Sequence, residues 1–89
     1  MKAILTVIGK DQVGIVYNVA KICSESNINI RDINQTLMEE YFTMVVLLDL
    51  EKSSYSLTEI QKKFNQLGEE MNLKIKLQNE EIFNSIYNI

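Results

Sequence analysis

The spacing of apolar residues predicts an α+β fold: an antiparallel four-stranded sheet with two helices on one face, followed by a C-terminal helix. Two observations support this. Apolar residues alternate or run continuously in four short segments, which is typical of strands. They recur every three or four residues in two segments between those strands, which is typical of helices. The resulting order, β-α-β-β-α-β within 89 residues, is that of the ferredoxin-like sandwich.

The first expected strand, residues 2–8, is apolar at nearly every position. Such a strand is expected to be central and covered on both faces. Gly9 follows it and is expected to let the chain leave the strand at a backbone angle that a side chain would resist.

The first helix is predicted over residues 14–25, where apolar residues form one broad stripe. Asp11 is a candidate N-cap whose carboxylate would accept from backbone N–H groups near Gly14. Asn27 is expected to end the helix in a left-handed conformation.

The second and third strands are predicted over residues 28–38 and 41–50, joined by a turn at Glu39-Glu40. The apolar residues of the second strand change parity midway, and a β-bulge near Arg31-Asp32 would reconcile the two halves. The third strand is apolar on both faces. We therefore expect helices to cover one face of the sheet and another copy of the chain to cover the other.

The second half of the domain begins with a capping box, Ser56-x-x-Glu59, which predicts a helix ending near Gly68. Residues 73–78 alternate apolar and polar side chains, as a half-buried fourth strand would. Asn79 is a candidate N-cap for a short amphipathic helix in residues 79–89. A helix this short requires docking, and the open face of the sheet, its own or a partner's, is the expected position.

Composition limits the chemistry. The chain is one domain, and its 46% apolar residues favour a folded protein. It has no histidine and one cysteine, Cys23, so a catalytic histidine, an internal disulfide and a zinc site are not expected. We expect no metal and no cofactor. Cys23 lies on the apolar side of the first helix, where a buried thiol is expected and a reactive nucleophile is the alternative.

Charge limits the partners. The net charge is −3, with acidic and basic residues interspersed, which disfavours nucleic-acid binding. The first apolar segment is too short for a signal peptide or a membrane span, so no membrane partner is expected. A single cysteine suits a reducing compartment, and the expected location is cytoplasmic.

The turn between the first strand and the first helix is a candidate ligand site. A helix N-terminus presents unpaired N–H groups and favours an anion, and Asp11 beside it could accept from an ammonium group. Together the two groups would suit the zwitterion of an amino acid. The alternative is that Asp11 only caps the helix while glycine shapes the turn.

These features resemble the ACT domain family. The resemblance covers residues 1–78, and residues 79–89 form a helical extension beyond it. It is carried by the apolar first strand, Asp11-x-x-Gly14, the helix, Asn27-Ile28-Asn29-Ile30 and the long hairpin that follows. The chain looks most like free-standing bacterial ACT proteins and, more distantly, the ACT repeats of glycine-cleavage regulators. Many members have proline where this chain has Val13.

The resemblance implies a regulatory module that pairs with itself and binds an amino acid or a related metabolite where two copies meet. In that comparison Asp11 binds the ligand amino group or caps the loop, and Val13 and Gly14 present N–H groups to a carboxylate. Asn29, from the same or the partner subunit, bonds the ligand, or it only satisfies the strand backbone. The implied ligand-binding residues are Asp11, Gln12, Val13, Gly14, Asn27, Ile28 and Asn29.

Two functions follow as hypotheses. The first is a homodimeric sensor that binds an amino acid and alters a partner enzyme or regulator. The second is a ligand-free dimerisation or protein–protein interaction module, which the doubly apolar strands and amphipathic tail would serve. An enzyme is not expected, because no nucleophile–base pair, carboxylate pair or nucleotide-binding loop stands out.

Overall fold

The computed structural model describes residues 1–87 and confirms the predicted order of elements. The elements are β1 (Lys2–Lys10), α1 (Ile15–Glu25), β2 (Asn29–Met38), β3 (Tyr41–Asp49), α2 (Leu57–Met71), β4 (Lys74–Asn79) and α3 (Glu80–Tyr87). Residues 88–89 of the predicted extension lie outside the described residues.

The four strands form one antiparallel sheet in the order β2-β3-β1-β4. β1 is central, as predicted, and β2 and β4 are the edges. Lys2 lies opposite Asp49 of β3, and Lys10 lies opposite Tyr41. This register makes the turn after β1 and the β2–β3 hairpin neighbours at one end of the molecule.

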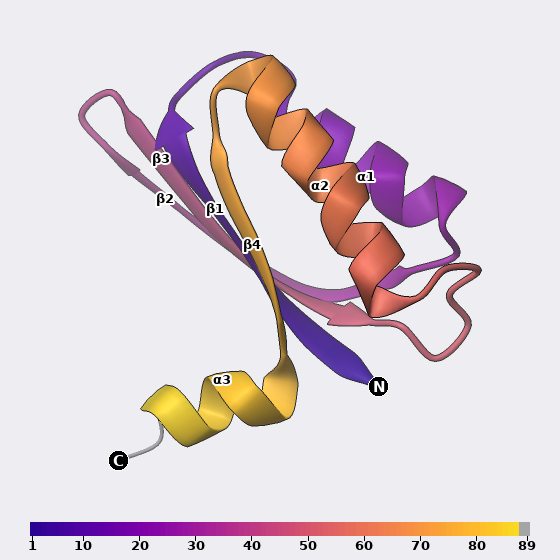
Figure 1. Ribbon diagram of the computed structural model, residues 1–89. Helices are drawn as coiled ribbons and strands as arrows, with labels where there is room; N and C mark the ends of the chain where they lie inside the picture. The colour runs from indigo at the N-terminus through magenta and orange to yellow at the C-terminus, as the bar shows by residue number, and fades with distance from the viewer. Residues whose placement is uncertain (88–89) are drawn as a thin grey trace.

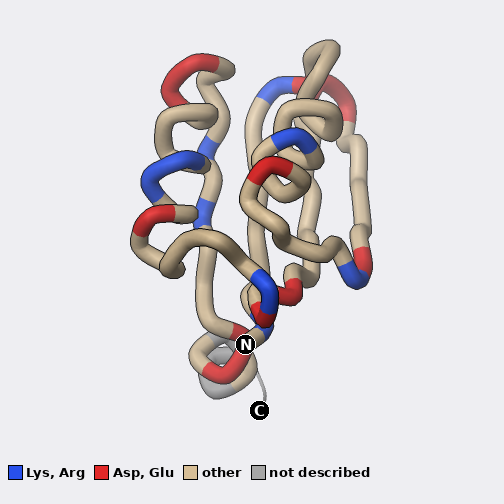
Figure 2. The backbone as a smooth tube through the Cα atoms, turned by 90° about the vertical axis from the view of Figure 1, so that its right-hand side faces the viewer, with Lys and Arg blue, Asp and Glu red and all other residues tan. Residues whose placement is uncertain are grey.

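The molecule has two main layers. α1 and α2 lie side by side on one face of the sheet, whereas α3 leaves the end of β4 on the opposite side (Figure 1). Acidic and basic residues are interspersed along the chain (Figure 2).

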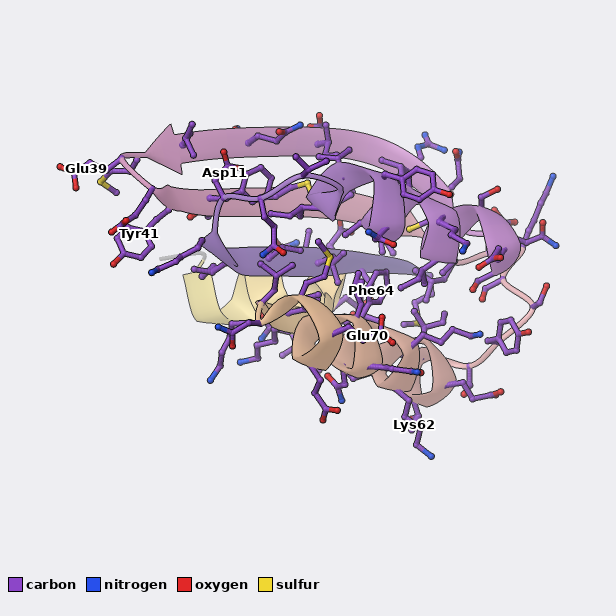
Figure 3. All side chains as sticks on the ribbon, turned by 90° about the horizontal axis from the view of Figure 1, so that it is seen from above. Asp11, Glu39, Tyr41, Lys62, Phe64 and Glu70 are labelled. Atoms are coloured by element: carbon purple, nitrogen blue, oxygen red, sulfur yellow. The ribbon has the colours of Figure 1, made fainter. Side chains whose placement is uncertain are left out.

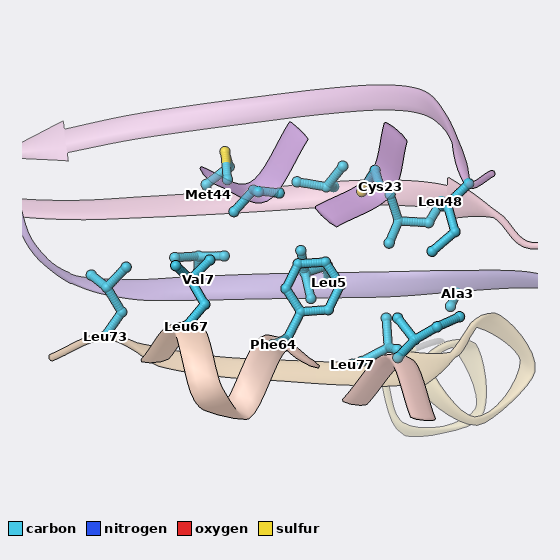
Figure 4. Close-up of a cluster of buried hydrophobic side chains, with 14 of the residues drawn as sticks. Ala3, Leu5, Val7, Cys23, Met44, Leu48, Phe64, Leu67, Leu73 and Leu77 are labelled. Carbon is cyan, nitrogen blue, oxygen red and sulfur yellow. The ribbon is translucent and has the colours of Figure 1, made fainter. Parts of the chain in front are cut away.

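The core lies between the sheet and the two helices. Alternation along β1 turns Ala3, Leu5 and Val7 toward the helices, and all three are fully buried. Phe64 of α2 is buried against them (Figure 4). The remaining buried apolar residues are Ile15, Val19, Cys23, Ile28, Phe42, Met44, Val46, Leu48, Leu50, Ile60, Leu67, Leu73 and Leu77.

The other face of the sheet is not covered by helices α1 and α2. On β1, Ile4 and Thr6 are half-buried and Ile8 is 46% exposed, while Val45 of β3 is 37% exposed. Both helices pack on the same side of β1, so the single chain covers only one face of this strand fully. Covering of the other face by another copy stays a prediction.

Several local predictions are confirmed. Ser56 and Glu59 form the reciprocal capping box. The β2–β3 register shifts between Ile30 and Asp32, which makes Arg31 the extra residue of a bulge. The Asn79 side chain accepts from the Glu81 N–H at 2.8 Å, as an N-cap does.

Gly9 has a different role from the one expected, whereas Gly68 lies where the sequence predicted, in the last turn of a helix. Gly9 lies inside β1 without a positive φ, so the expectation of an unusual backbone angle there is wrong. A Cβ on Gly9 would lie 2.5 Å from Leu73 Cδ2, so a larger residue there would require the buried Leu73 side chain to move. Gly68 lies in the last turn of α2, where a Cβ would lie 2.7 Å from the Leu73 carbonyl oxygen.

Candidate functional site

The turn between β1 and α1 is built around Gly14. Gly14 is the N-cap of α1 and has φ 94°, a left-handed conformation that glycine adopts without steric cost. No side chain in the described part of the chain caps this helix, and the prediction that Asp11 is the N-cap is wrong. The helix begins at Ile15, and an N-cap side chain reaches only the next two or three N–H groups. Asp11 lies three residues too early.

The absence of a cap leaves donors free at this turn. The first backbone bond of α1 runs from the Asn18 N–H to the Gly14 carbonyl at 2.9 Å, so the N–H groups of the preceding helical residues have no partner within the helix. The Asp11 carboxylate is exposed and makes no hydrogen bond with the described residues. Val13 is 99% exposed.

Two long-range hydrogen bonds fix the turn. The Asp11 N–H donates to the Glu40 carbonyl at 2.8 Å, which ties the turn to the β2–β3 hairpin. Figure 3 shows Asp11 at the same end of the molecule as Glu39 and Tyr41. The Gln12 side-chain amide donates to the Met71 carbonyl at 2.9 Å, so this predicted ligand residue also joins the turn to the end of α2.

The second group of predicted residues lies where α1 ends. Asn27 has φ 57°, and the Ile28 N–H donates to the Cys23 carbonyl at 2.9 Å, which confirms the predicted left-handed termination. The Asn27 amide donates to Ser54 Oγ at 3.3 Å. Ile28 is buried in the core, while Asn29 is exposed at the start of β2.

An open hollow of about 600 Å³ lies at this second group. Its lining includes charged residues that sequence reasoning missed, and Arg31 Nη1 lies 3.5 Å from Asp49 Oδ2 among them. The bulge predicted near Arg31-Asp32 marks Arg31 in the sequence. No local pattern marks Asp49, which lies at the end of β3. The lining residues are Ser24, Asn27, Ile28, Asn29, Arg31, Asp49, Glu51 and Lys52.

A single chain does not bring the two groups together. Asn29 lies opposite Asp49, which lies opposite Lys2, whereas Asp11 follows Lys10 at the other end of β1. The eight steps from one end of β1 to the other span about 26 Å at the usual rise of a strand.

Other reactive groups are scarce in the described part of the chain. Cys23 is a buried free thiol, and burial raises its pKa to about 11, which opposes a role as a nucleophile. Among residues 1–87, no group of three metal-binding side chains converges. None of the described helices is both long and apolar enough to span a bilayer.

Comparison with known proteins identifies the family. The family model of the ACT domain matches residues 2–78. A UPF0237 protein from Clostridium acetobutylicum is 50% identical over 86 residues, which are 97% of each chain. The solved structure of an ACT domain protein from Streptococcus pneumoniae is 41% identical, with a TM-score of 0.81 over 93% of each chain.

More distant structures share the fold. A proposed glycine cleavage system transcriptional repressor has a TM-score of 0.74 at 22% identity and covers 86% of this chain and 44% of its own. The regulatory subunit of aspartate kinase from Thermus thermophilus has a TM-score of 0.68 at 20% identity and covers 86% of this chain and 50% of its own. The ACT family model covers most of the chain, a relative matches it over nearly its whole length, and a solved ACT domain protein shares its fold. This protein therefore belongs to the ACT domain family.

Proposed function

We propose that this protein is a regulatory module that binds an amino acid or a related metabolite where two copies of the chain meet. Membership of the ACT family and the two structural neighbours named for regulatory proteins support the regulatory role. The observation that carries the proposal is the position of the two groups of candidate residues at opposite ends of one exposed edge strand.

That strand is β2. All of its residues are exposed except Ile30, which is half-buried, and it forms an edge of the sheet. Asn29 begins it, and the hairpin that follows its end accepts the Asp11 N–H at Glu40. One group of candidate residues therefore lies at the start of β2 and the other is tied to its end.

Pairing of two β2 edges about a two-fold axis would unite the groups. An exposed edge strand is a template for a second strand, and in an antiparallel pair the start of one lies beside the end of the other. Asn29 of each subunit would then lie near Asp11 of the partner subunit. The dimer would therefore have two equivalent sites. Apolar side chains exposed beside this edge support the pairing: Ile33 is 37% and Leu37 is 60% exposed.

The turn suits a zwitterion. Among the described residues, neither the first N–H groups of α1 nor the Asp11 carboxylate has a partner, so the former favour a carboxylate and the latter favours an ammonium group. A ligand that contacts both subunits stabilises the arrangement in which its contacts form. This change of arrangement would alter a partner enzyme or regulator.

A thermal-shift screen against the twenty amino acids tests the proposal. A ligand at one hundred times its dissociation constant stabilises the folded state by about 2.7 kcal/mol. For a domain of this size the melting temperature should rise by on the order of 10 °C. We expect the rise to be selective, to be lost in Asp11→Ala and to persist in Glu69→Ala, which removes an exposed carboxylate elsewhere. A response that is the same in Asp11→Ala would contradict the role of the turn.

A second candidate is a ligand-free interaction module. It is favoured by the exposed apolar residues of the open sheet face and by Ile82 of α3, which is 56% exposed. Deleting residues 79–89 should then abolish self-association, measured by sedimentation, while Asp11→Ala should change little. A truncated chain that still forms a stable dimer removes the main support for this candidate.

We further propose that the protein is not an enzyme and acts in the cytoplasm. The raised pKa of Cys23 supports the first point, and a free buried thiol suits the reducing cytoplasm. Turnover by the isolated protein that disappears in Asp11→Ala would overturn the first.

A further inference from the structure

The hollow at the start of β2 carries both signs of charge. Arg31 and Lys52 are cationic, and Asp49 and Glu51 are anionic. Asn27 and Asn29 add two amides. A volume of about 600 Å³ lies within the range of small-molecule sites, so a metabolite fits this hollow.

Arg31 is presented to the hollow by the bulge. As the extra residue between Ile30 and Asp32, it has no direct partner on β3. Bulges re-aim a side chain in this way. Arg31 is the chain's one arginine, and its side chain is 50% exposed.

Asp49 positions that arginine. Its Oδ2 lies 3.5 Å from Arg31 Nη1, and its Oδ1 accepts from the Glu51 N–H at 3.0 Å. The Asp49 side chain is only 18% exposed, so it is less free to move than an exposed carboxylate. Arg31 makes no other polar contact with the described residues, and a guanidinium has five N–H donors. Most of its donors are therefore available to a ligand.

We propose that Arg31, positioned by Asp49, binds the carboxylate of the ligand and so restricts the ligand to compounds with a free carboxylate. This inference rests on the proposed function and assigns a specificity residue to its site. A guanidinium binds a carboxylate through two parallel hydrogen bonds, which a lysine cannot reproduce. A carboxylate has about four lone-pair positions, so Arg31 and the N–H groups of the partner's turn can bind the same group.

The rest of the hollow fits the other end of an amino acid. The Glu51 carboxylate makes no hydrogen bond with the described residues and can accept from an ammonium group, as can the amide oxygens of Asn27 and Asn29. The hollow thus selects ligands that carry both a carboxylate and an ammonium group.

The test measures binding of each of the twenty amino acids beside its α-amide, which keeps the ammonium group and side chain but lacks the carboxylate. The proteins are the full-length wild type, Arg31→Gln, Arg31→Lys, Asp49→Asn and the charge-matched control Lys62→Gln. Lys62 is exposed on α2, away from the hollow. Calorimetry gives the affinities, and the melting temperature without ligand confirms that each variant folds.

We expect the wild type and Lys62→Gln to bind an amino acid and to reject its amide. Arg31→Gln should bind about 10- to 100-fold more weakly, the usual range for loss of a charge-assisted hydrogen bond. The affinity of Arg31→Lys should lie between those of the wild type and Arg31→Gln. Asp49→Asn should reduce the preference for the acid over the amide without lowering the melting temperature by more than a few degrees, which a purely structural role would not produce.

Two other outcomes are distinct. If an amino acid binds and Asp11→Ala weakens it while Arg31→Gln does not, the role of Arg31 is overturned and the proposed function stands. If no amino acid binds the wild type, both the amino-acid ligand and the role of Arg31 are overturned.

Discussion

The two ends of this molecule offer a ligand different chemistry. At the turn end, Gly14 and the start of α1 present backbone N–H groups beside Asp11, and the described residues provide neither a cap for the helix nor a partner for this carboxylate. At the hollow end, the groups are charged side chains, with Arg31 held by Asp49. The first end depends on backbone conformation, and the second depends on side-chain charge.

We propose that the two ends complete each other in one site. Free N–H groups at one helix terminus are common, and a charged pair half exposed to solvent contributes little by itself. The β2 edge connects the two ends, and pairing of two such edges would supply both kinds of group to one ligand. Substitutions at each end should separate their contributions.

The largest effect is expected at Gly14. Gly14→Ala places a Cβ in a left-handed conformation, which should reduce the free energy of unfolding by about 1–2 kcal/mol. Chemical denaturation measures this loss. The matched control is Asn27→Gly at the other end of α1, which also has a positive φ; it should leave stability nearly unchanged. Equal stability of Gly14→Ala and wild type would show that backbone conformation does not define the turn end.

A smaller effect is expected at the hollow. Asp49→Asn should lower the free energy of unfolding by about 0–1 kcal/mol, because the ion pair with Arg31 is partly exposed. Denaturation at low and high salt measures it, and the difference from wild type should shrink at high salt. A loss as large as that in Gly14→Ala would contradict the contrast between the two ends.

A third prediction concerns the pH dependence of stability at Cys23, which lies on the helix that joins the two ends. Its folded-state pKa is raised from 9.0 to about 11 by burial, so the folded protein keeps the proton longer than the unfolded chain. This contribution to stability is therefore complete below pH 9 and lost between about pH 9 and 11. Denaturation from pH 7 to 11 should show a steeper loss for wild type than for Cys23→Ala. Parallel curves would indicate that the thiol is accessible.

The sequence predicted those parts of the fold that local patterns determine. The capping box at Ser56, the left-handed Asn27 and the bulge at Arg31 each depend on a few neighbouring residues, and the structure confirms all three. The central position of β1 was predicted from its nearly continuous apolar sequence, and the structure confirms it.

The sequence was less informative where distant segments meet. The predicted cap at Asp11 was wrong because the bond from its N–H to Glu40 directs the chain before the helix begins, and nothing near Asp11 in the sequence reveals that contact. Gln12 bonds Met71 and Arg31 pairs with Asp49, and both partners are likewise remote in the chain. Local motifs identified the candidate residues of the site. Their relative position depends on the sheet register, which local motifs do not determine.

Complementation between two inactive variants tests the shared site most directly. Asp11→Ala removes the carboxylate of the turn, and Asn29→Ala removes an amide of the hollow. The melting temperature of each variant alone should therefore not rise with the amino acid that stabilises wild type. In a mixed two-fold dimer, one site carries both substitutions and the other carries neither.

Unfolding and refolding the two variants together should therefore restore binding. With random pairing, half of the dimers are mixed and each has one intact site, so calorimetry should find about one quarter of the wild-type sites. That result would establish that each site takes its two ends from different chains. A mixture that binds no more than either variant alone would contradict the account.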